Sequence, residues 1–432
     1  MSVENKFLSS KTIRINGGNR LRGETTVDGA KNSVILLIPA ACVATRGVTN
    51  LENVPLVSDV DVMIDIMDEI GIISSREGSS LSIDSTSLKS GHISQNLMSK
   101  IRHSILFLGP LVATLGEAKI SLPGGDNFGD RPIDIHISAL KSLGIDTTIE
   151  NGIIYAKAKE LPLKAANINL RFPSFGATVQ SILTACRAVG TTVIENAAID
   201  PEIVDLILFL NKMGANVQVS GTRKITVQGV ENLEGVNHQV IPDRLEAGAL
   251  LVAFAVTRGE GIIHGVIPEH NGTIIALLKE IGLELKYIGT NSISVFTPKE
   301  LQSICISASP FPGLSTDMQP QIVSLATICQ GESVIKDTVF DGRFSICAEL
   351  RKMGALIEID RESNLVRING VGSLKGTHVE AKDIRAAVGL VCAGIAATGT
   401  TYLSGLEHLH RGHGNLVNKL YELGAEIEYV SD

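Results

Sequence analysis

A pattern of apolar and polar positions recurs six times along the chain. Each copy ends an amphipathic segment with a glycine, as in LKSLG or LKEIG, and alternating apolar and polar residues follow, as in AEIEYV. A glycine at such a place is typical of a helix C-terminus, and the alternation is typical of a strand. The six glycines, 68 to 73 residues apart, are Gly71, Gly144, Gly214, Gly282, Gly354 and Gly424. This spacing predicts six copies of one αβ unit.

A second series of glycines has the same period and again suggests a helix that ends before a strand. Its members are Gly47, Gly116, Gly190, Gly259, Gly331 and Gly399. The segments before them are apolar nearly all round, as in SVILLIPAACVA and LEAGALLVAFAV. A helix without a polar face must be buried on every side. We therefore expect each repeat to contribute one buried central helix.

These repeats predict an α/β fold of two lobes, with six repeats of about 70 residues and three repeats per lobe. One lobe is expected to be discontinuous, with residues 1–31 plus 241–432 and repeats 4 to 6. The other lobe is expected to span residues 32–240, with repeats 1 to 3 and a glycine-rich active-site loop at 122–136. The opening segment KTIRINGG precedes the first repeat and should complete the discontinuous lobe.

Composition and charge argue against several classes of function. Hydrophobic residues make up 44% of the 432 residues and the formal net charge is −8, so a broad basic surface for nucleic acid is not expected. Apolar stretches such as 247–256 are shorter than the roughly 18 residues of a membrane span. The six cysteines have neither a CxxC pair nor metal-ligand spacing, which indicates buried thiols and no metal. With a polar N-terminus untypical of a signal peptide, these features predict a cytoplasmic protein without a membrane partner.

Charged and polar residues stand where the buried helices begin. They are Lys31 and Asn32, Lys100 and Arg102, Ser174 and Gly176, Asp243 and Arg244, Asp317 and Gln319, and Asp383 and Arg385. Helix N-termini attract phosphates and carboxylates. Each of the acids and Ser174 could instead be a simple N-cap. The bases oppose the helix dipole unless an acid or a bound anion compensates, which favours an anion site.

The loop at residues 122–136, LPGGDNFGDRPIDIH, lies between two repeat elements. Its glycines permit conformations closed to other residues, and Asp126 and Arg131 would bring an acid and an anion clamp to a cleft. We expect a mobile lid, and the alternative is an exposed turn with solvated charges.

Several motifs together resemble the UDP-N-acetylglucosamine 1-carboxyvinyltransferase family, within the enolpyruvyl transferases. They are GAKN (29–32), LPGG (122–125), GDRPIDIH (129–136), FPSFGAT (172–178), ENAAIDPEIVD (195–205), PDRLE (242–246), TDMQ (316–319) and VFDGRF (339–344). The resemblance covers nearly the full length. It implies an inside-out α/β barrel in each lobe, an active site between the lobes and an open form that closes over the sugar nucleotide.

The resemblance also implies the reaction. The family transfers the enolpyruvyl group of phosphoenolpyruvate to the 3-hydroxyl of UDP-N-acetylglucosamine by addition and elimination, releases phosphate, and uses neither a metal nor a cofactor. This is the first committed step of peptidoglycan precursor synthesis. Asp317 matches the aspartate beside the attacking hydroxyl and would be the general base.

The remaining roles follow from the same match. The phosphoenolpyruvate phosphate would be held by Lys31, Arg131 and Arg411. The amino sugar would contact Asn32, Arg102 and Val339. Charge in the tetrahedral intermediate would be stabilised by Arg343 and Arg385. The uridine diphosphate site would be lined by Arg131, Pro132, Ile133, Asp134, Ile135, Ser174, Phe175 and, at the same helix N-terminus, Gly176.

Some residues depart from the family pattern. Asp126 stands where many relatives carry a cysteine, and it can still deliver a proton although it cannot form a thioether with epoxide inhibitors. Asp130, Ile199, His410 and His413 are also unusual. These departures leave open an enolpyruvyl transferase with a different uridine nucleotide as acceptor. A non-catalytic paralogue that binds the ligand is a further alternative, and the sequence does not predict the oligomeric state.

Overall fold

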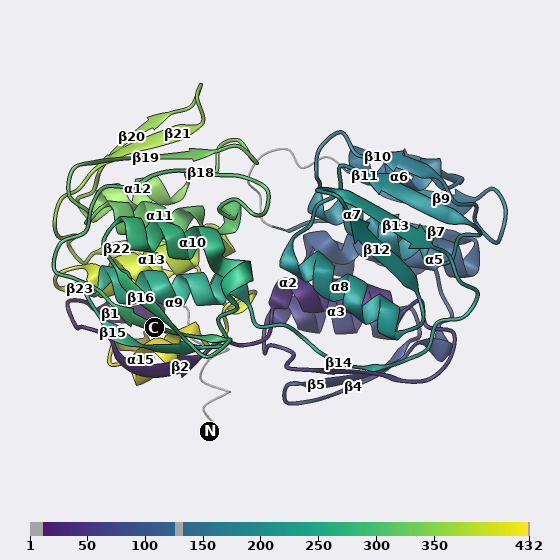
Figure 1. Ribbon diagram of the computed structural model, residues 1–432, viewed down its shortest axis with the longest axis horizontal. Coiled ribbons are helices and arrows are strands. Elements are labelled where there is room, and N and C mark those ends of the chain that lie inside the picture. The colour runs from purple at the N-terminus through teal and green to yellow at the C-terminus, as the bar shows by residue number, and fades with distance from the viewer. Residues whose placement is uncertain (1–11, 126–132, 431–432) are drawn as a thin grey trace. The chain divides into compact units, whose positions relative to one another are not determined.

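The computed structural model describes residues 12–125 and 133–430 (Figure 1). The described residues form two compact units. Unit 1 holds residues 12–28 and 242–430, and unit 2 holds residues 29–125 and 133–241. Each unit contains three four-stranded sheets and an interior of helices, so the prediction of a two-lobed α/β fold with three repeats per lobe is confirmed.

In unit 2 the three sheets have equivalent strand orders. The first is β14 (Asn237–Gln239), β3 (Thr49–Glu52), β5 (Ser80–Asp84) and β4 (Ile73–Glu77). The second is β6 (His92–Ile93), β7 (Glu117–Ser121), β9 (Ile153–Ala158) and β8 (Ile145–Glu150). The third is β10 (Asn167–Asn169), β11 (Thr191–Glu195), β13 (Lys224–Gln228) and β12 (Asn216–Ser220).

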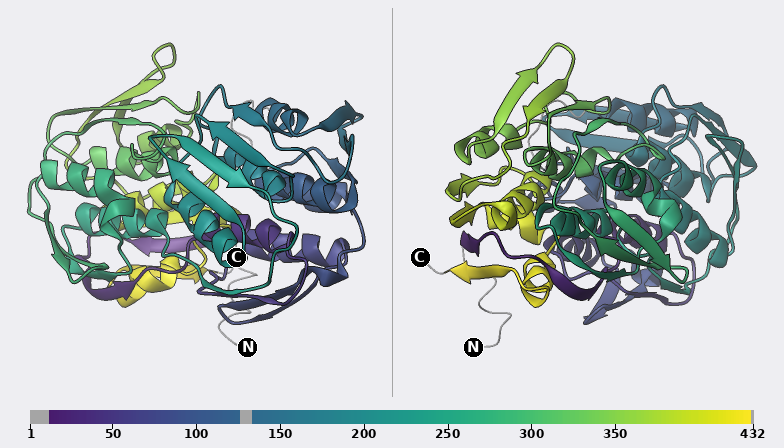
Figure 2. Two further views of the ribbon diagram at one scale, coloured as in Figure 1. Left: turned by 45° about the vertical axis from the view of Figure 1, so that its right-hand side comes forward. Right: turned by 60° about the vertical axis from the view of Figure 1, so that its left-hand side comes forward.

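Unit 1 repeats the same plan. Its sheets are β2 (Arg22–Thr26), β15 (Glu260–His264), β17 (Ser292–Phe296) and β16 (Glu284–Ile288); β18 (Cys305–Ala308), β19 (Glu332–Asp337), β21 (Leu365–Asn369) and β20 (Leu356–Asp360); and β22 (His378–Glu380), β23 (Thr400–Ser404), β1 (Thr12–Asn16) and β24 (Glu426–Val430). Figure 2 shows from two further sides how β20 and β21 run together to a hairpin tip away from the central helices.

Every sheet pairs its first strand in parallel with the second, and its other neighbours are antiparallel. Strand β1 lies in the last sheet of unit 1, between β23 and β24, with Ile13 opposite Leu403. A second feature was not predicted. Strand β2 leads into unit 2 yet pairs with β15 of unit 1, whereas β14 leads into unit 1 yet pairs with β3 of unit 2. Two equivalent repeats have thus exchanged their first strands.

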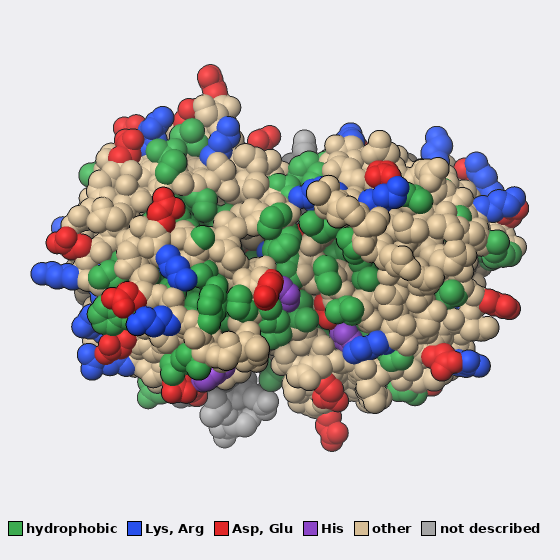
Figure 3. Space-filling model, in the orientation of Figure 1, with side chains coloured by type: hydrophobic (Ala, Val, Ile, Leu, Met, Phe, Trp, Pro, Cys, Tyr) green, Lys and Arg blue, Asp and Glu red, His purple; other side chains and the backbone are tan. Residues whose placement is uncertain are grey.

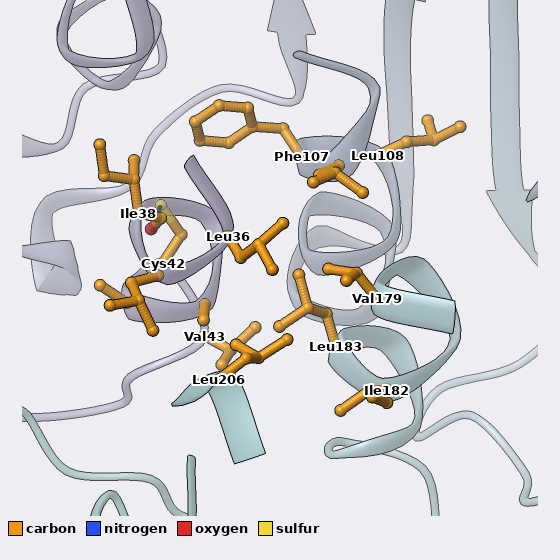
Figure 4. Close-up of a cluster of buried hydrophobic side chains, with 14 of the residues drawn as sticks. Leu36, Ile38, Cys42, Val43, Phe107, Leu108, Val179, Ile182, Leu183 and Leu206 are labelled. Carbon is orange, nitrogen blue, oxygen red and sulfur yellow. Dashed lines mark hydrogen bonds between the residues drawn. The ribbon is translucent and has the colours of Figure 1, made fainter. Parts of the chain in front are cut away.

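Three apolar helices lie at the centre of each unit. Those of unit 2 are α2 (Lys31–Ala41), α5 (Leu108–Leu115), preceded by η2 (Arg102–Phe107), and α7 (Phe175–Ala185). Those of unit 1 are α9 (Arg244–Val256), α11 (Gln319–Ala326), preceded by η3 (Thr316–Met318), and α13 (Ile384–Ala396). Figure 4 shows Leu36 of α2 and Leu183 of α7 together with Leu206 in the core of unit 2. The predicted central helices are therefore buried over most of their length.

The second helix of each repeat is amphipathic. These helices are α3 (Ser58–Glu69), α6 (Asp134–Ser142), α8 (Pro201–Lys212), α10 (Pro268–Glu280), α12 (Ile346–Lys352) and α15 (Leu416–Glu422). Shorter helices are η1 (Ser85–Ser87), α4 (Gln95–Met98) and α14 (Leu406–His410). In α3 the buried positions Val60, Met63 and Met67 recur at helical spacing. The glycine just beyond each of the six amphipathic helices has a φ between +81° and +117°, as the repeat pattern predicts.

Two details correct the sequence interpretation. After α9 it is Arg258, with a φ of 56°, that takes the left-handed conformation rather than Gly259. A Cβ on Gly259 would lie 2.6 Å from the carbonyl oxygen of Leu21, so close packing excludes a side chain there. Cys305 is exposed on the edge strand β18, whereas the five other cysteines are buried as expected.

Within residues 12–125 and 133–430, the chain passes from one unit to the other after Asp28 and after Ile241. In unit 1 the backbone N–H of Asp243 donates to the carbonyl of Asp28 at 2.8 Å. The ammonium of Lys419 lies 2.8 Å from the Asp28 carboxylate and 2.6 Å from Glu246. Burial raises the pKa of Glu246 to about 7, although Lys419 opposes the shift. A buried ion cluster therefore anchors the first crossing segment.

On the face of the molecule shown in Figure 3, acidic and basic side chains are interspersed. Within the described residues, no helix is both long and apolar enough to cross a membrane.

Two glycine substitutions should change stability in opposite directions. A Cβ on Gly389 of α13 would lie 2.5 Å from Ile346 and 3.0 Å from the carbonyl oxygen of Pro320, so Gly389→Ala overpacks the central helices. We expect a loss of about 1–3 kcal/mol in the free energy of unfolding. Gly272 in the exposed face of α10 has open space around it, and Gly272→Ala should gain about 0.5–1 kcal/mol. Urea unfolding of both variants measures the difference, and a stabilised Gly389→Ala would contradict the packing argument.

Candidate active site

Lys31 begins helix α2, where its charge opposes the helix dipole. Its ammonium lies 2.6 Å from the carboxylate of Asp59, which projects from α3 and is almost fully buried. The acid compensates the dipole and restricts a side chain that is itself only 12% exposed. Lys31 is therefore held in one orientation at the end of a buried helix.

A buried polar network anchors the first turn of the same helix. The hydroxyl of Ser33 donates to the carboxylate of Asp205 in α8. The other carboxylate oxygen lies 2.9 Å from Nε2 of His238 in β14, and Nδ1 of His238 lies 3.3 Å from the ammonium of Lys212. The two ring nitrogens of His238 thus connect Asp205 with Lys212. The exchanged strand β14 thus supports the turn that carries Lys31 and Asn32.

The N-terminus of α7 contributes the candidate nucleotide site of unit 2. Ser174 accepts a hydrogen bond from the backbone N–H of Ala177, at 3.3 Å. A Cβ on Gly176 would lie 2.8 Å from the ring of His136, so only glycine allows this contact. Burial, together with the nearby Arg102 guanidinium, lowers the pKa of His136 to about 4. His136 is therefore a neutral ring packed on the helix that begins beside Ser174.

Ile133, Asp134 and Ile135 open helix α6 in the same unit. Asp134 forms an ion pair of 2.5 Å with Arg171, and Arg171 directly precedes the FPSFGAT motif (172–178). This pair links the start of α6 to the segment that leads into α7. Asp126, Arg131 and Pro132 lie outside the described residues.

In unit 1 the N-terminal ends of α11 and α13, with the segment between β19 and α12, bring an acid and two arginines together. Asp317 Oδ1 lies 3.2 Å from Nη1 of Arg343 and 3.9 Å from Nη1 of Arg385. The arginine side chains are 3% and 8% exposed, whereas Asp317 is 38% exposed. Asp383 holds Arg385 through a contact of 3.1 Å to Nε. The cluster presents one accessible carboxylate between two fixed cations.

The structure shows which of the candidate N-cap residues cap a helix and which does not. Asp243 accepts from the backbone N–H groups of Leu245 and Glu246, and Asp383 accepts from those of Arg385 and Ala386. With Ser174 these residues are N-caps, as the simpler interpretation held. Asp317 is different, because Ser315 caps η3 and accepts from the N–H of Asp317 itself. The Asp317 side chain is thereby left to face the arginines.

The other candidate residues lie at the ends of helices or beside Asp337. Arg102 begins η2 in unit 2. In unit 1 Val339 donates its backbone N–H to Asp337 at 2.8 Å, and Arg411 directly follows α14. Lys31, Asn32, Arg102 and the nucleotide residues thus belong to unit 2, whereas Asp317, Val339, Arg343, Arg385 and Arg411 belong to unit 1. Among the described residues no group of three or more histidine, cysteine or acidic side chains is arranged to hold a metal ion.

Sequence reasoning missed several residues that hold these clusters together, among them Asp59, Thr316 and Asp337. Asp59 carried a usable signal, because it is an acid on the apolar side of the amphipathic helix α3. Thr316 and Asp337 gave none, since a threonine before a candidate base and an acid at a strand end are both common. The Thr316 hydroxyl donates to the Asp337 carboxylate at 2.6 Å, a contact that arises only when β19 packs beside η3.

Comparison with known proteins places the chain in a family. It belongs to the EPSP synthase (3-phosphoshikimate 1-carboxyvinyltransferase) family, whose model matches residues 15–420. Among its relatives is UDP-N-acetylglucosamine 1-carboxyvinyltransferase 1 of Staphylococcus epidermidis, 44% identical over 97% of this chain and 99% of that protein. UDP-N-acetylglucosamine 1-carboxyvinyltransferase 2 of Staphylococcus saprophyticus is 43% identical over 96% of this chain and 98% of that protein. The family resemblance inferred from the motifs is confirmed.

Solved structures support the fold. The enolpyruvyl transferase NikO of Streptomyces tendae has a TM-score of 0.88 and 24% identity, covering 98% of this chain and all of that one. An EPSP synthase of Acinetobacter baumannii has a TM-score of 0.76 and 20% identity over 96% of this chain and 99% of that one.

The pKa of His136 generates a prediction about stability. The folded protein binds fewer protons than the unfolded chain between the ordinary histidine pKa of 6.5 and the folded value of about 4. The stability contributed by the neutral ring is therefore complete above pH 6.5 and is lost as the pH falls from 6.5 toward 4. Between pH 7 and pH 5 the loss should be about 2 kcal/mol, since one pKa unit equals about 1.4 kcal/mol.

Urea unfolding of wild type and His136→Gln at pH 7, 6 and 5 measures this contribution. The variant should show a shallower loss of unfolding free energy toward pH 5. His92→Gln removes an exposed imidazole and serves as the control. Parallel pH profiles for wild type and His136→Gln would contradict the prediction.

Proposed function

We propose that the protein transfers the enolpyruvyl group of phosphoenolpyruvate to the 3-hydroxyl of UDP-N-acetylglucosamine and releases phosphate. The step would be the first committed one in cytoplasmic synthesis of peptidoglycan precursors. The observation that carries the proposal is the accessible Asp317 carboxylate between the buried Arg343 and Arg385. The names of relatives with 43% and 44% identity over nearly the whole chain support the choice of acceptor.

In the addition step, Asp317 accepts the proton of the sugar hydroxyl as its oxygen bonds to C2 of the enol. C3 gains a proton in the same step, and Asp126 is the proposed donor. The result is a tetrahedral intermediate that carries a carboxylate and a phosphate. In the elimination step C3 loses a proton and the phosphate leaves, which restores the enol double bond.

The charges in the clusters suit these steps. Lys31, which Asp59 holds in place, is assigned to the phosphate together with Arg131 and Arg411. The guanidinium groups of Arg343 and Arg385 are buried and fixed, so they can stabilise the carboxylate without reorganisation. Asn32, Arg102 and Val339 are assigned to the amino sugar. The turn around Ser174, Phe175 and Gly176 is assigned to the uridine diphosphate with residues 131–135.

The first test measures phosphate release from phosphoenolpyruvate with and without UDP-N-acetylglucosamine. Release should require the sugar nucleotide, and Asp317→Asn should lower it by at least about a hundredfold, because general base catalysis contributes that much. Asp360→Asn changes an exposed turn carboxylate in the same unit and should leave the rate within about twofold. The conformational stability of both variants is measured in parallel.

The outcomes of this test discriminate the alternatives. Turnover with another uridine nucleotide but not with UDP-N-acetylglucosamine would favour the different acceptor suggested by Asp130, Ile199, His410 and His413. Tight binding of the sugar nucleotide without turnover would favour a non-catalytic paralogue. Full activity of Asp317→Asn would remove Asp317 from the role of base.

Asp126 generates a further prediction. An epoxide inhibitor that alkylates the loop cysteine of relatives should not inactivate this protein, because a carboxylate is a far weaker nucleophile than a thiolate. Asp126→Cys should gain a covalent adduct on residue 126, detectable by mass spectrometry of the intact protein and its peptides. The exposed Cys305 serves as an internal control for non-specific alkylation. Rapid inactivation of wild type with an adduct on residue 126 would refute the prediction.

A further inference from the structure

Asp337, at the end of strand β19, has no role in the reaction described above. Its side chain is buried, with the residue 1% exposed. One carboxylate oxygen accepts from the hydroxyl of Thr316 at 2.6 Å. The other accepts from the backbone N–H groups of Val339 at 2.8 Å and Phe340 at 3.1 Å. A carboxylate is retained in such a place only when donors surround it, so these three bonds hold it in one orientation.

The carboxylate determines the direction of the hydrogen bonds around Thr316. A carboxylate only accepts, so the Thr316 hydroxyl must donate to Asp337. The lone pairs of that hydroxyl then face Nη1 of Arg343, which donates to it at 2.9 Å. The same Nη1 donates to Asp317 at 3.2 Å. A directed chain therefore runs from Arg343 through Thr316 to Asp337.

A second contact leads from Asp337 to Arg343. The Arg343 guanidinium lies 3.8 Å from the centre of the Phe340 ring. The backbone of Phe340 is one of the three donors that Asp337 binds. A guanidinium over an aromatic ring is attracted to its face, so the position of this ring helps to determine that of the cation. One buried carboxylate thus supports Arg343 through a hydroxyl and through a ring.

We propose that Asp337 and Thr316 are positioning residues that hold the Arg343 guanidinium against Asp317. The inference rests on the proposed function, in which Arg343 stabilises the carboxylate of the intermediate and Asp317 is the base. Neither positioning residue needs to touch substrate. Without the chain, Arg343 keeps its charge but loses the hydroxyl that orients Nη1, and misplaced groups lower the rate of a step that needs alignment.

Three variants test the chain. Thr316→Ser keeps the hydroxyl, Thr316→Val replaces it by a methyl group of similar size, and Asp337→Asn presents an amide that can donate toward Thr316. Thr338→Val is the matched control, because the Thr338 hydroxyl in the same segment donates to the carbonyl of Ala308, at 2.8 Å. Phosphate release is measured for each variant over a range of phosphoenolpyruvate and of UDP-N-acetylglucosamine concentrations.

We expect kcat to fall by at least about tenfold in Thr316→Val and Asp337→Asn, with a higher KM for phosphoenolpyruvate. In Thr316→Val the KM for UDP-N-acetylglucosamine should stay within about twofold. Asp337 still accepts from the backbone N–H of Val339, the residue assigned to the amino sugar. Thr316→Ser should keep kcat within about threefold of the wild-type value. Thr338→Val should have the kcat and KM values of wild type. In the double variant Thr316→Val/Asp337→Asn the two losses should not multiply, since both break one chain.

A purely structural role would give a different result. Thr316→Val and Asp337→Asn would then unfold at lower temperature while the folded fraction kept the kcat and KM of wild type. That outcome, or a Thr316→Val as active as Thr338→Val, overturns the proposal. If wild type turns over and Thr316→Val is unaffected, the positioning chain alone fails. If wild type releases no phosphate with UDP-N-acetylglucosamine, the proposed function fails and the positioning role fails with it.

Discussion

The burial of helices that have no polar face is the constraint on which the rest of this structure depends. Helices such as α9 and α13 are buried along nearly their whole length, and a single αβ repeat cannot enclose one of them. Three repeats together place three such helices at the centre of a unit and cover them with amphipathic helices and sheets. Close approach is part of the arrangement, because positions such as Gly389 leave no space for a side chain.

The same constraint positions the charged groups. A helix buried along its length still exposes unpaired N–H groups at its N-terminus, so polar residues gather there. Asp243 and Asp383 satisfy these groups as N-caps, and Lys31 is balanced by Asp59. Asp317 is released from capping because Ser315 takes that role. One helix end thereby gains a carboxylate that faces two buried arginines instead of its own backbone.

The exchange of first strands ties this chemistry to the connection between the units. Strand β14 contributes His238, which supports Asp205 and so the first turn of α2 with Lys31. Strand β2 precedes Asp28, which the buried Lys419 and Glu246 hold at the crossing. The network at β14 therefore reaches the helix that carries Lys31, whereas the network at Asp28 reaches α9 and α15.

The sequence by itself determined the repeat, the identity of the buried helices and the residue types at their N-termini. Those features depend on local periodicity and on glycine, which act over a few residues. The tertiary structure alone decided that β2 and β14 are exchanged, that Ser174, Asp243 and Asp383 cap helices whereas Asp317 does not, and that Asp337 reaches Arg343 through Thr316. Such outcomes depend on which distant segments pack side by side, and hydrogen bonds between them have directions that periodicity does not encode.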